Sequence, residues 1–257
     1  MNLERLPDGR VGGRIPMGPQ ATTAHGALSI GAVATLVDDV AGVMAAEAQE
    51  AHAVTSQLGL RLAQVDGCTG VRCESRVVRA GRALVTQVID ITDEGTGRSL
   101  GAATMVSAVL PSGGSGSHNP AERRGGPDVW TQREHAASDI TIDRWLEMEV
   151  SGQEGDTTLL ALPLHMRLRN VVGVLHGGAQ MLLVEQAALL AAAQHGSTHP
   201  VVDDVDVDML APGTIGPLTM RARLVGAQPA RMHFVIDLTD EGNDGRLVAL
   251  ALAGVTP

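Results

Sequence analysis

The feature that most constrains this chain is an internal repeat with one fixed offset. Residues 88–95 read VIDITDEG and residues 235–242 read VIDLTDEG, a shift of 147 positions (235 − 88 = 147). The same shift carries Gly31 onto Gly178 and Asp38 onto Glu185, so a helix-like segment and a distant strand share one offset. The copies align without a gap from about residue 23 to about residue 95. The chain is therefore a tandem duplication, and its two halves should share one fold.

Each copy has the same predicted order: a glycine-containing loop, a long apolar helix, and then strands. The helices, at about 30–48 and 177–194, are apolar nearly all the way round, so they should be buried on most sides. Alternating and β-rich runs predict strands near 58–62, 85–91, 99–110, 205–209, 234–238 and 246–255. Short turns join these strands, so antiparallel pairing is expected. A short helix at about 140–147 should lead into the second copy.

A sheet wrapped around a central helix buries such a helix, and this arrangement is the hotdog fold. We therefore expect an α+β double hotdog: two antiparallel sheets, each wrapped around a long central helix and joined edge to edge as an internal pseudo-dimer. The predicted domains are a first hotdog repeat at 1–110 and a second at 137–257. Between them, residues 111–136 are rich in glycine, serine and proline and should form a flexible linker.

Composition excludes several classes of function. The net charge of −10, the absence of lysine and tyrosine, and a single phenylalanine argue against binding to nucleic acid or acidic membranes. Cys68 and Cys73 have no metal-type partners nearby and read as reduced thiols, so no metal is expected. The polar first ten residues and the lack of an apolar run of about 18 residues predict a soluble, cytoplasmic protein.

One segment of the second copy resembles a known family. Asn170, His176, Gly177, Gly178 and then Glu185, nine positions after the histidine, look like the signature of PaaI-like hotdog acyl-CoA thioesterases. The resemblance covers both repeats and is densest at residues 170–193. It implies hydrolysis of an acyl-CoA thioester, with coenzyme A as part of the substrate and no other cofactor. In that family the acid comes from one subunit and the helix start, Asn and His from the other, so the resemblance implies a cross-repeat site.

The residues are also chemically suited to this reaction. Gly177 and Gly178 open a helix, where free N–H groups and the helix dipole suit a carbonyl oxygen that becomes an oxyanion. An acid two turns into an apolar helix is partly desolvated, which favours a role as base or nucleophile. Activation of water and direct attack both remain open.

The two copies are not equivalent. In place of Asn170, His176 and Gly177, the first copy has Thr23, Ser29 and Ile30. The complete site should therefore combine the acid of copy one with the helix start of copy two. The resemblance to related enzymes implies that a hydroxyl early in the next strand, Thr55 or Ser56, helps to hold water. The expected catalytic residues are Asp38, Asn170, His176, Gly177, Gly178 and Thr55. The second site, expected to be weak, would contain Glu185, Ser29 and Gly31, with Thr23 beside them.

Other polar residues have more than one interpretation. The phosphates of coenzyme A could be held by four arginines on matching strands, which could equally be ordinary surface residues: Arg76, Arg79, Arg221 and Arg223. Asp39 is expected to be a structural or exposed neighbour of Asp38, and His25 a structural residue that could partly replace a lost donor. The acids at 203, 204, 206 and 208 read as the wet face of a strand.

Three functions compete. Thioester hydrolysis leads. A hotdog hydratase or dehydratase ranks lower, because neither the Asp-x-x-x-x-His nor the His-Phe-Pro-Gly pattern is present. A non-catalytic acyl-CoA or ligand-binding protein is the third alternative, since the first copy has lost polar residues. The expected partners are the acyl-CoA substrate and other copies of this chain. The two repeats should form an internal pseudo-dimer, and whole chains could assemble further into a homo-oligomer.

Overall fold

The computed structural model describes the chain except residues 50, 64–66, 111–139 and 171–172. The first half contains β1 (Asn2–Arg5), β2 (Val11–Pro16), α1 (Ile30–Gln49), β3 (Ala53–Leu62), β4 (Gly70–Ala80), β5 (Leu84–Asp93) and β6 (Ser99–Val109). The second contains α2 (Ile142–Leu146), β7 (Glu149–Glu154), β8 (Thr157–Leu162), the 3₁₀ turn η3 (Met166–Leu168), α3 (Gly177–Gln194), β9 (Val201–Met209), β10 (Leu218–Gln228), β11 (Arg231–Asp240) and β12 (Arg246–Thr256). The predicted linker at 111–136 lies outside the described residues.

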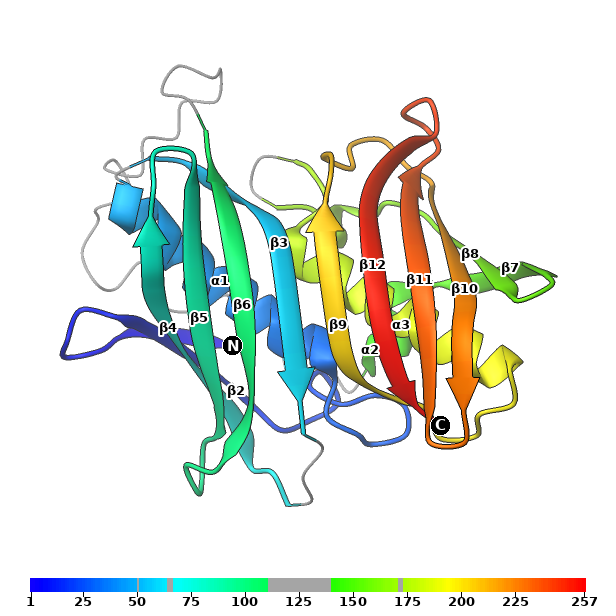
Figure 1. Cartoon of the computed structure of the whole chain (residues 1–257), viewed down its shortest axis with the longest axis horizontal. Helices are drawn as coiled ribbons and strands as arrows, with labels where there is room; N and C mark the ends of the chain where they lie inside the picture. The colour runs from blue at the N-terminus through cyan, green and yellow to red at the C-terminus, as the bar shows by residue number, and fades with distance from the viewer. Residues whose placement is uncertain (50, 64–66, 111–139, 171–172) are drawn as a thin grey trace.

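All described strands join one antiparallel sheet of 12 strands (Figure 1). Their order is β1-β2-β4-β5-β6-β3-β9-β12-β11-β10-β8-β7, which reads as the same series of equivalent strands from either edge. The repeats meet where β3 pairs antiparallel with β9, with Leu58 opposite Val207 and Leu60 opposite Val205. The expected edge-to-edge pairing therefore merges the two predicted sheets into one continuous sheet.

The repeat extends further than the aligned residues indicated. Gly13 in β2 pairs with Cys73 in β4, and Leu160 in β8 pairs with Met220 in β10, so these strands keep the offset of 147 (160 − 13 and 220 − 73). The offset is kept even by a register shift, which occurs at Val77 to Arg79 in β4 and at residues 224 to 226 in β10. The strands β1, β2, β7 and β8 were not predicted. Their sequences differ between the copies, but β2 and β8 pair with equivalent strands at the same register.

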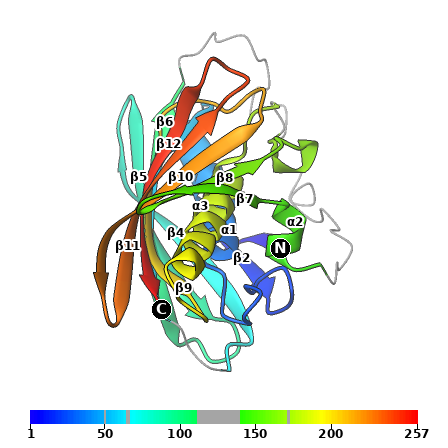
Figure 2. The ribbon, with the colours of Figure 1, turned by 90° about the vertical axis from the view of Figure 1, so that its right-hand side faces the viewer.

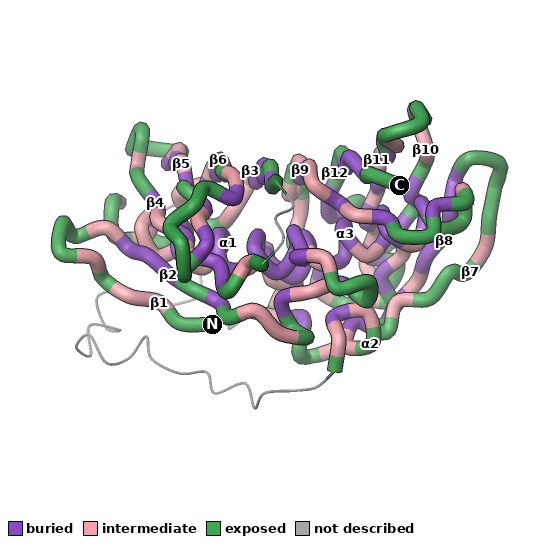
Figure 3. The backbone as a smooth tube through the Cα atoms, turned by 90° about the horizontal axis from the view of Figure 1, so that it is seen from below, coloured by how far each residue is buried: buried purple, intermediate pink, exposed green. Residues whose placement is uncertain are grey.

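Both long helices pack against one face of the sheet (Figure 2). They are buried along most of their length, as their composition predicted, and buried residues alternate with more exposed ones along the strands (Figure 3). The predicted bounds of α3 are correct and those of α1 are one residue short. No helix in the described part of the chain is both long and apolar enough to cross a membrane.

Glycine lets the two helices approach closely at two equivalent points. A Cβ atom on Gly31 would lie 2.7 Å from the Cα of Leu182, and one on Gly178 would lie 2.7 Å from the Cα of Thr35. These are the same contact seen from the two repeats, because Thr35 and Leu182 also differ by 147 positions. Contacts at this distance exclude any side chain, so the first turn of each helix lies directly against the other helix.

Candidate active site

The same turn precedes each long helix. The Asn170 N–H donates to the carbonyl of Val174 at 2.8 Å, and the Thr23 N–H makes the equivalent bond at 2.8 Å. Each turn contains a glycine in the left-handed region, with φ of +86° at Gly173 and +80° at Gly26. Each turn leads directly into the start of a long helix, and that helix start lies against the acid of the other repeat.

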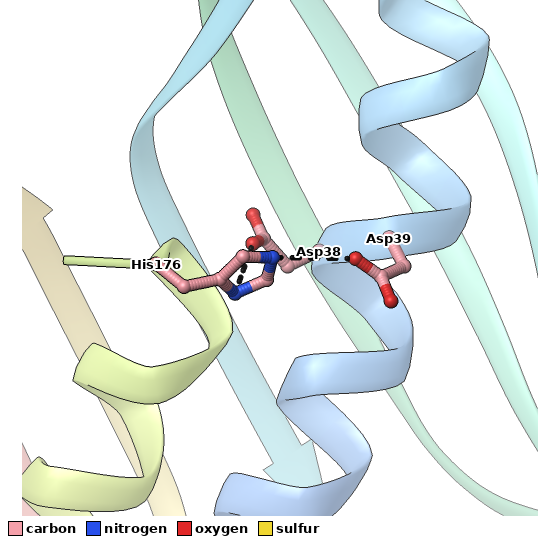
Figure 4. A group of neighbouring side chains, drawn as sticks. All are labelled: Asp38, Asp39 and His176. Atoms are coloured by element: carbon pink, nitrogen blue, oxygen red, sulfur yellow. Dashed lines mark ion pairs between the residues drawn. The ribbon is translucent and has the colours of Figure 1, made fainter. Parts of the chain in front are cut away.

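Asp38 lies at the start of α3, as the cross-repeat prediction required. The Thr55 hydroxyl donates to Asp38 Oδ1 at 2.6 Å, and the Gly178 N–H donates to Oδ2 at 2.9 Å. His176 Nδ1 lies 3.6 Å from the same Oδ2 (Figure 4). Asp38 is 8% exposed. One buried carboxylate thus receives a hydroxyl from its own repeat and a backbone N–H from the other.

His176 is the N-cap of α3. Its Nδ1 accepts the Gly178 N–H at 3.0 Å, so we assign the ring proton to Nε2. Nε2 lies 3.4 Å from Asp39 Oδ1 (Figure 4). At Nδ1 the imidazole therefore accepts a hydrogen bond from the first turn of α3.

The Gly177 N–H is open. Within the described ranges no hydrogen-bond acceptor is recorded for it, although it is the first N–H of α3. A Cβ atom at Gly177 would lie 2.7 Å from Asp38 Oδ2, so a side chain here would collide with the carboxylate. The glycine keeps an available backbone donor beside a buried acid, which is the arrangement that stabilises an oxyanion.

Glu185 fills the equivalent position completely. Its carboxylate accepts the Ser29 hydroxyl at 2.5 Å, the Ile30 N–H at 2.9 Å and the Gly31 N–H at 3.1 Å. It is 2% exposed. Glutamate is one methylene longer than aspartate, and its two oxygens reach both of the first two N–H groups of α1. The donors of this second site are therefore occupied by the protein itself.

Burial raises the pKa of both acids. For Asp38, desolvation outweighs the positive charge of a protonated His176 and the hydrogen bonds from Thr55 and Gly178, which lower the pKa. For Glu185, desolvation raises the pKa to about 7 against the hydrogen bonds from Ser29, Gly31 and Ile30. An acid whose pKa is raised toward neutrality suits proton transfer, but only Asp38 has an open donor beside it.

The other predicted residues lie at varying distances from this site. The Asn170 side chain accepts the Val174 N–H at 3.2 Å, so it helps to close the turn before α3. Ser56 donates to the carbonyl of Val106 at 3.0 Å, which leaves Thr55 as the hydroxyl that faces Asp38. His25 is exposed and stacks edge to face on His199, with the ring centroids 5.4 Å apart.

The four arginines do not join the Asp38 site. They are exposed and lie on the face of the sheet opposite the helices, because their strand neighbours Ser75 and Ala222 point toward the helices. Arg221 pairs with Glu154 at 3.0 Å. On the same outer face, Arg61 and Arg231 pair with acids of the 203–206 run. A role of the four arginines in holding coenzyme A stays a prediction.

Asp39 is the residue whose place the sequence did not reveal. With Asp38 and His176 it forms a group whose ligand-type atoms lie within 4.8 Å of one another. The closest approaches use different ring nitrogens, Nδ1 toward Asp38 at 3.6 Å and Nε2 toward Asp39 at 3.4 Å. The only sign in the sequence that Asp39 belongs to this site was its position directly after Asp38. The sequence did not show that Asp39 faces His176.

Comparison with known proteins gives a partial family match and the fold. Residues 172–246 match the model of the Thioesterase superfamily. This segment contains His176, Gly177, Gly178 and Glu185 but covers less than a third of the chain. The fold is a hotdog fold. No curated protein matches the sequence.

The solved structures with this fold extend over the whole chain. The tesB protein of Mycobacterium avium subspecies paratuberculosis superposes with a TM-score of 0.68 at 14% identity, covering 99% of this chain and 94% of that one. A proposed thioesterase of Novosphingobium aromaticivorans gives 0.66 at 19% identity, covering 99% and 97%. An acyl-ACP thioesterase of Bacteroides thetaiotaomicron gives 0.60 at 13% identity, covering 95% and 96%. At these identities the likeness establishes the fold alone.

Proposed function

We propose that this chain hydrolyses an acyl-CoA thioester to the free acid and coenzyme A, as a tandem double hotdog of the PaaI-like type. The observation that supports this most directly is the open Gly177 N–H beside the buried carboxylate of Asp38. A thioester carbonyl whose oxygen meets this N–H would have its carbon within reach of the acid. The Thioesterase superfamily match over residues 172–246 supports the same reaction.

Each residue has a distinct role in this mechanism. The Gly177 N–H stabilises the negative charge that develops on the carbonyl oxygen, and the Gly178 N–H holds the Asp38 carboxylate. Asp38 either takes a proton from the attacking water or attacks the carbonyl carbon itself. On the first route the oxygen of water bonds to the carbonyl carbon, the C–S bond breaks, and the proton held by Asp38 passes to the sulfur to give the thiol of coenzyme A. On the second route the Asp38 oxygen displaces the sulfur to give an anhydride, which water then hydrolyses to the free acid and Asp38 while one proton of that water goes to the thiol. Thr55 orients the Asp38 carboxylate, and His176 and Asn170 hold the start of α3 in place.

The Glu185 site makes no contribution to turnover in this proposal. Its N–H groups are already bonded to the Glu185 carboxylate, so a substrate oxygen would have to displace a buried charge. One chain then carries one working site.

Release of free thiol from a panel of acyl-CoAs tests the function, with Asp38→Asn as the control. The panel should include acyl-ACP, because one of the proteins with this fold is an acyl-ACP thioesterase. Thiol release by the wild type and not by the variant is expected. Saturable binding without release would instead indicate a binding protein, and loss of an enoyl-CoA double bond without thiol release would indicate a hydratase.

A further inference from the structure

Asp38 and Asp39 contact the same imidazole from one helix. Asp38 is buried and lies near Nδ1 of His176, whereas the half-buried Asp39 lies 3.4 Å from Nε2. The Gly178 N–H bonds to Nδ1 at 3.0 Å, which leaves Nε2 as the nitrogen that carries the proton. Figure 4 shows the ring between the two carboxylates, with Asp38 near Nδ1 and Asp39 near Nε2.

The repeat contains this pair only once. The position equivalent to Asp39 is Gln186, and the position equivalent to His176 is Ser29 (39 + 147 = 186; 29 + 147 = 176). The acid and the imidazole therefore occur together at the site with the open Gly177 N–H. Both are replaced at the site that Glu185 fills.

We propose that Asp39 is a positioning residue for the reaction at Asp38, an inference that rests on the proposed function. Its carboxylate lies 3.4 Å from Nε2, attracts the Nε2–H and so stops the ring from turning. Nδ1 then stays at the Gly178 N–H, and the first turn of α3 keeps the Gly177 N–H directed at the substrate oxygen. A histidine whose second nitrogen is bonded to a carboxylate has its orientation and tautomer fixed in the same way in other sites.

The charged groups recorded as facing this imidazole are the two neighbouring acids of α1. Asp38 is held by Thr55 and Gly178, so its position does not depend on Asp39. Removing the Asp39 side chain should therefore loosen His176 while leaving the Asp38 carboxylate in place. This separates a positioning role from a general loss of structure.

Nuclear magnetic resonance of ¹⁵N-labelled imidazoles tests the positioning without any need for turnover. The His176 signals are assigned by their loss in His176→Gln. We expect the wild type to show mainly the Nε2–H tautomer, and Asp39→Ala to show a mixture of tautomers. Asp39→Asn should restore the wild-type pattern, because its side-chain carbonyl still accepts the Nε2–H. Unchanged His176 signals in Asp39→Ala would overturn the proposal, even if thioesterase activity is never found.

Kinetics give the second readout. Asp39→Ala should lower kcat about tenfold to a hundredfold with little change in KM, and Asp39→Asn should recover most of the loss. Gln186→Ala is the matched control at the equivalent position, and it should change kcat by less than about twofold. A kcat for Asp39→Ala within twofold of the wild type would overturn the role, as would an equal loss in Gln186→Ala. If no variant or wild type releases thiol, the proposed function fails and the resonance result still decides the positioning.

Discussion

The starts of α1 and α3 follow the same backbone turn, but their leading N–H groups differ in whether the protein itself occupies them. At α1, the carboxylate of Glu185 accepts both leading N–H groups and the Ser29 hydroxyl. At α3, the shorter Asp38 accepts the Thr55 hydroxyl and, of the two leading N–H groups, the Gly178 N–H alone, so the Gly177 N–H stays open. One methylene in the acid, and a histidine or serine as the cap, separate a filled site from an open one. In the proposed mechanism, duplication thus allowed one site to become structural while the other kept its chemistry.

The largest expected effect is the loss of the acid at the open site. Asp38→Asn should lower kcat by about a thousandfold or more, because an amide neither takes up the proton nor attacks the carbonyl. The fold should survive, since the change is nearly isosteric. Thiol release at saturating substrate measures the effect, and circular dichroism checks the fold. A loss smaller than about tenfold would show that Asp38 is not the acid.

The Thr55 hydroxyl, which donates to Asp38, sharpens the comparison, because the second site has Val202 at the position equivalent to Thr55. Thr55→Val should lower kcat roughly tenfold, as it removes one hydrogen bond to a charged group. That bond lowers the pKa of Asp38, so without it the pKa rises further and the acidic limb of the pH–rate profile should move to higher pH. Ser56→Ala is the control, since Ser56 bonds to a backbone carbonyl instead. Equal profiles for the two variants would rule out this role of Thr55.

At the filled site, the expected effect is on stability. The pKa of Glu185 is raised by burial to about 7, so between about pH 4.5 and 7 the folded chain holds a proton that the unfolded chain releases. The contribution of Glu185 to the free energy of unfolding therefore falls as the pH rises through this window. Relative to Glu185→Gln, the wild type should lose roughly 1–3 kcal/mol between pH 5 and pH 8. Urea unfolding of both proteins measures this difference, and a difference that stays constant with pH would contradict it.

The smallest expected effect concerns the outer face of the sheet. If Arg76, Arg79, Arg221 and Arg223 hold the phosphates of coenzyme A, binding of a non-hydrolysable acyl-CoA should weaken a few-fold from low to high salt. Arg223→Ala should reduce this salt dependence. Binding that is insensitive to salt, and unaffected by Arg223→Ala, would remove these arginines from the account.

Much of the fold could be predicted from the sequence because the two copies confirm each other. The long helices have no polar face, and the Asp-Glu-Gly turns recur at one offset, so the order of helix and strands was readable. The strands β1, β2, β7 and β8 were missed because their sequences differ between the copies. Their place is set by pairing with β4 and β10, which is a long-range property.

The sequence predicted which residues come together at the candidate site, but it did not predict the hydrogen bonds between them. The resemblance to a known family implied that Asp38 lies opposite Gly178 and His176, and the structure brings these residues together. The occupation of the second site by Glu185 depends on side-chain length and on a helix approach that only glycine allows. The position of Asp39 beside His176 depends on the crossing of two helices from different repeats. The sequence pattern gives neither the closeness of the two helices nor the separation of Asp39 and His176.

The central claim, that one site works and the other is filled, is tested most directly by the turnover of two acid variants on one acyl-CoA. Glu185→Gln should keep at least about half of the wild-type kcat, because its site contributes little turnover. Asp38→Asn should keep about a thousandth or less. The opposite order, with Glu185→Gln inactive and Asp38→Asn nearly normal, would contradict the account and assign the reaction to the α1 helix start.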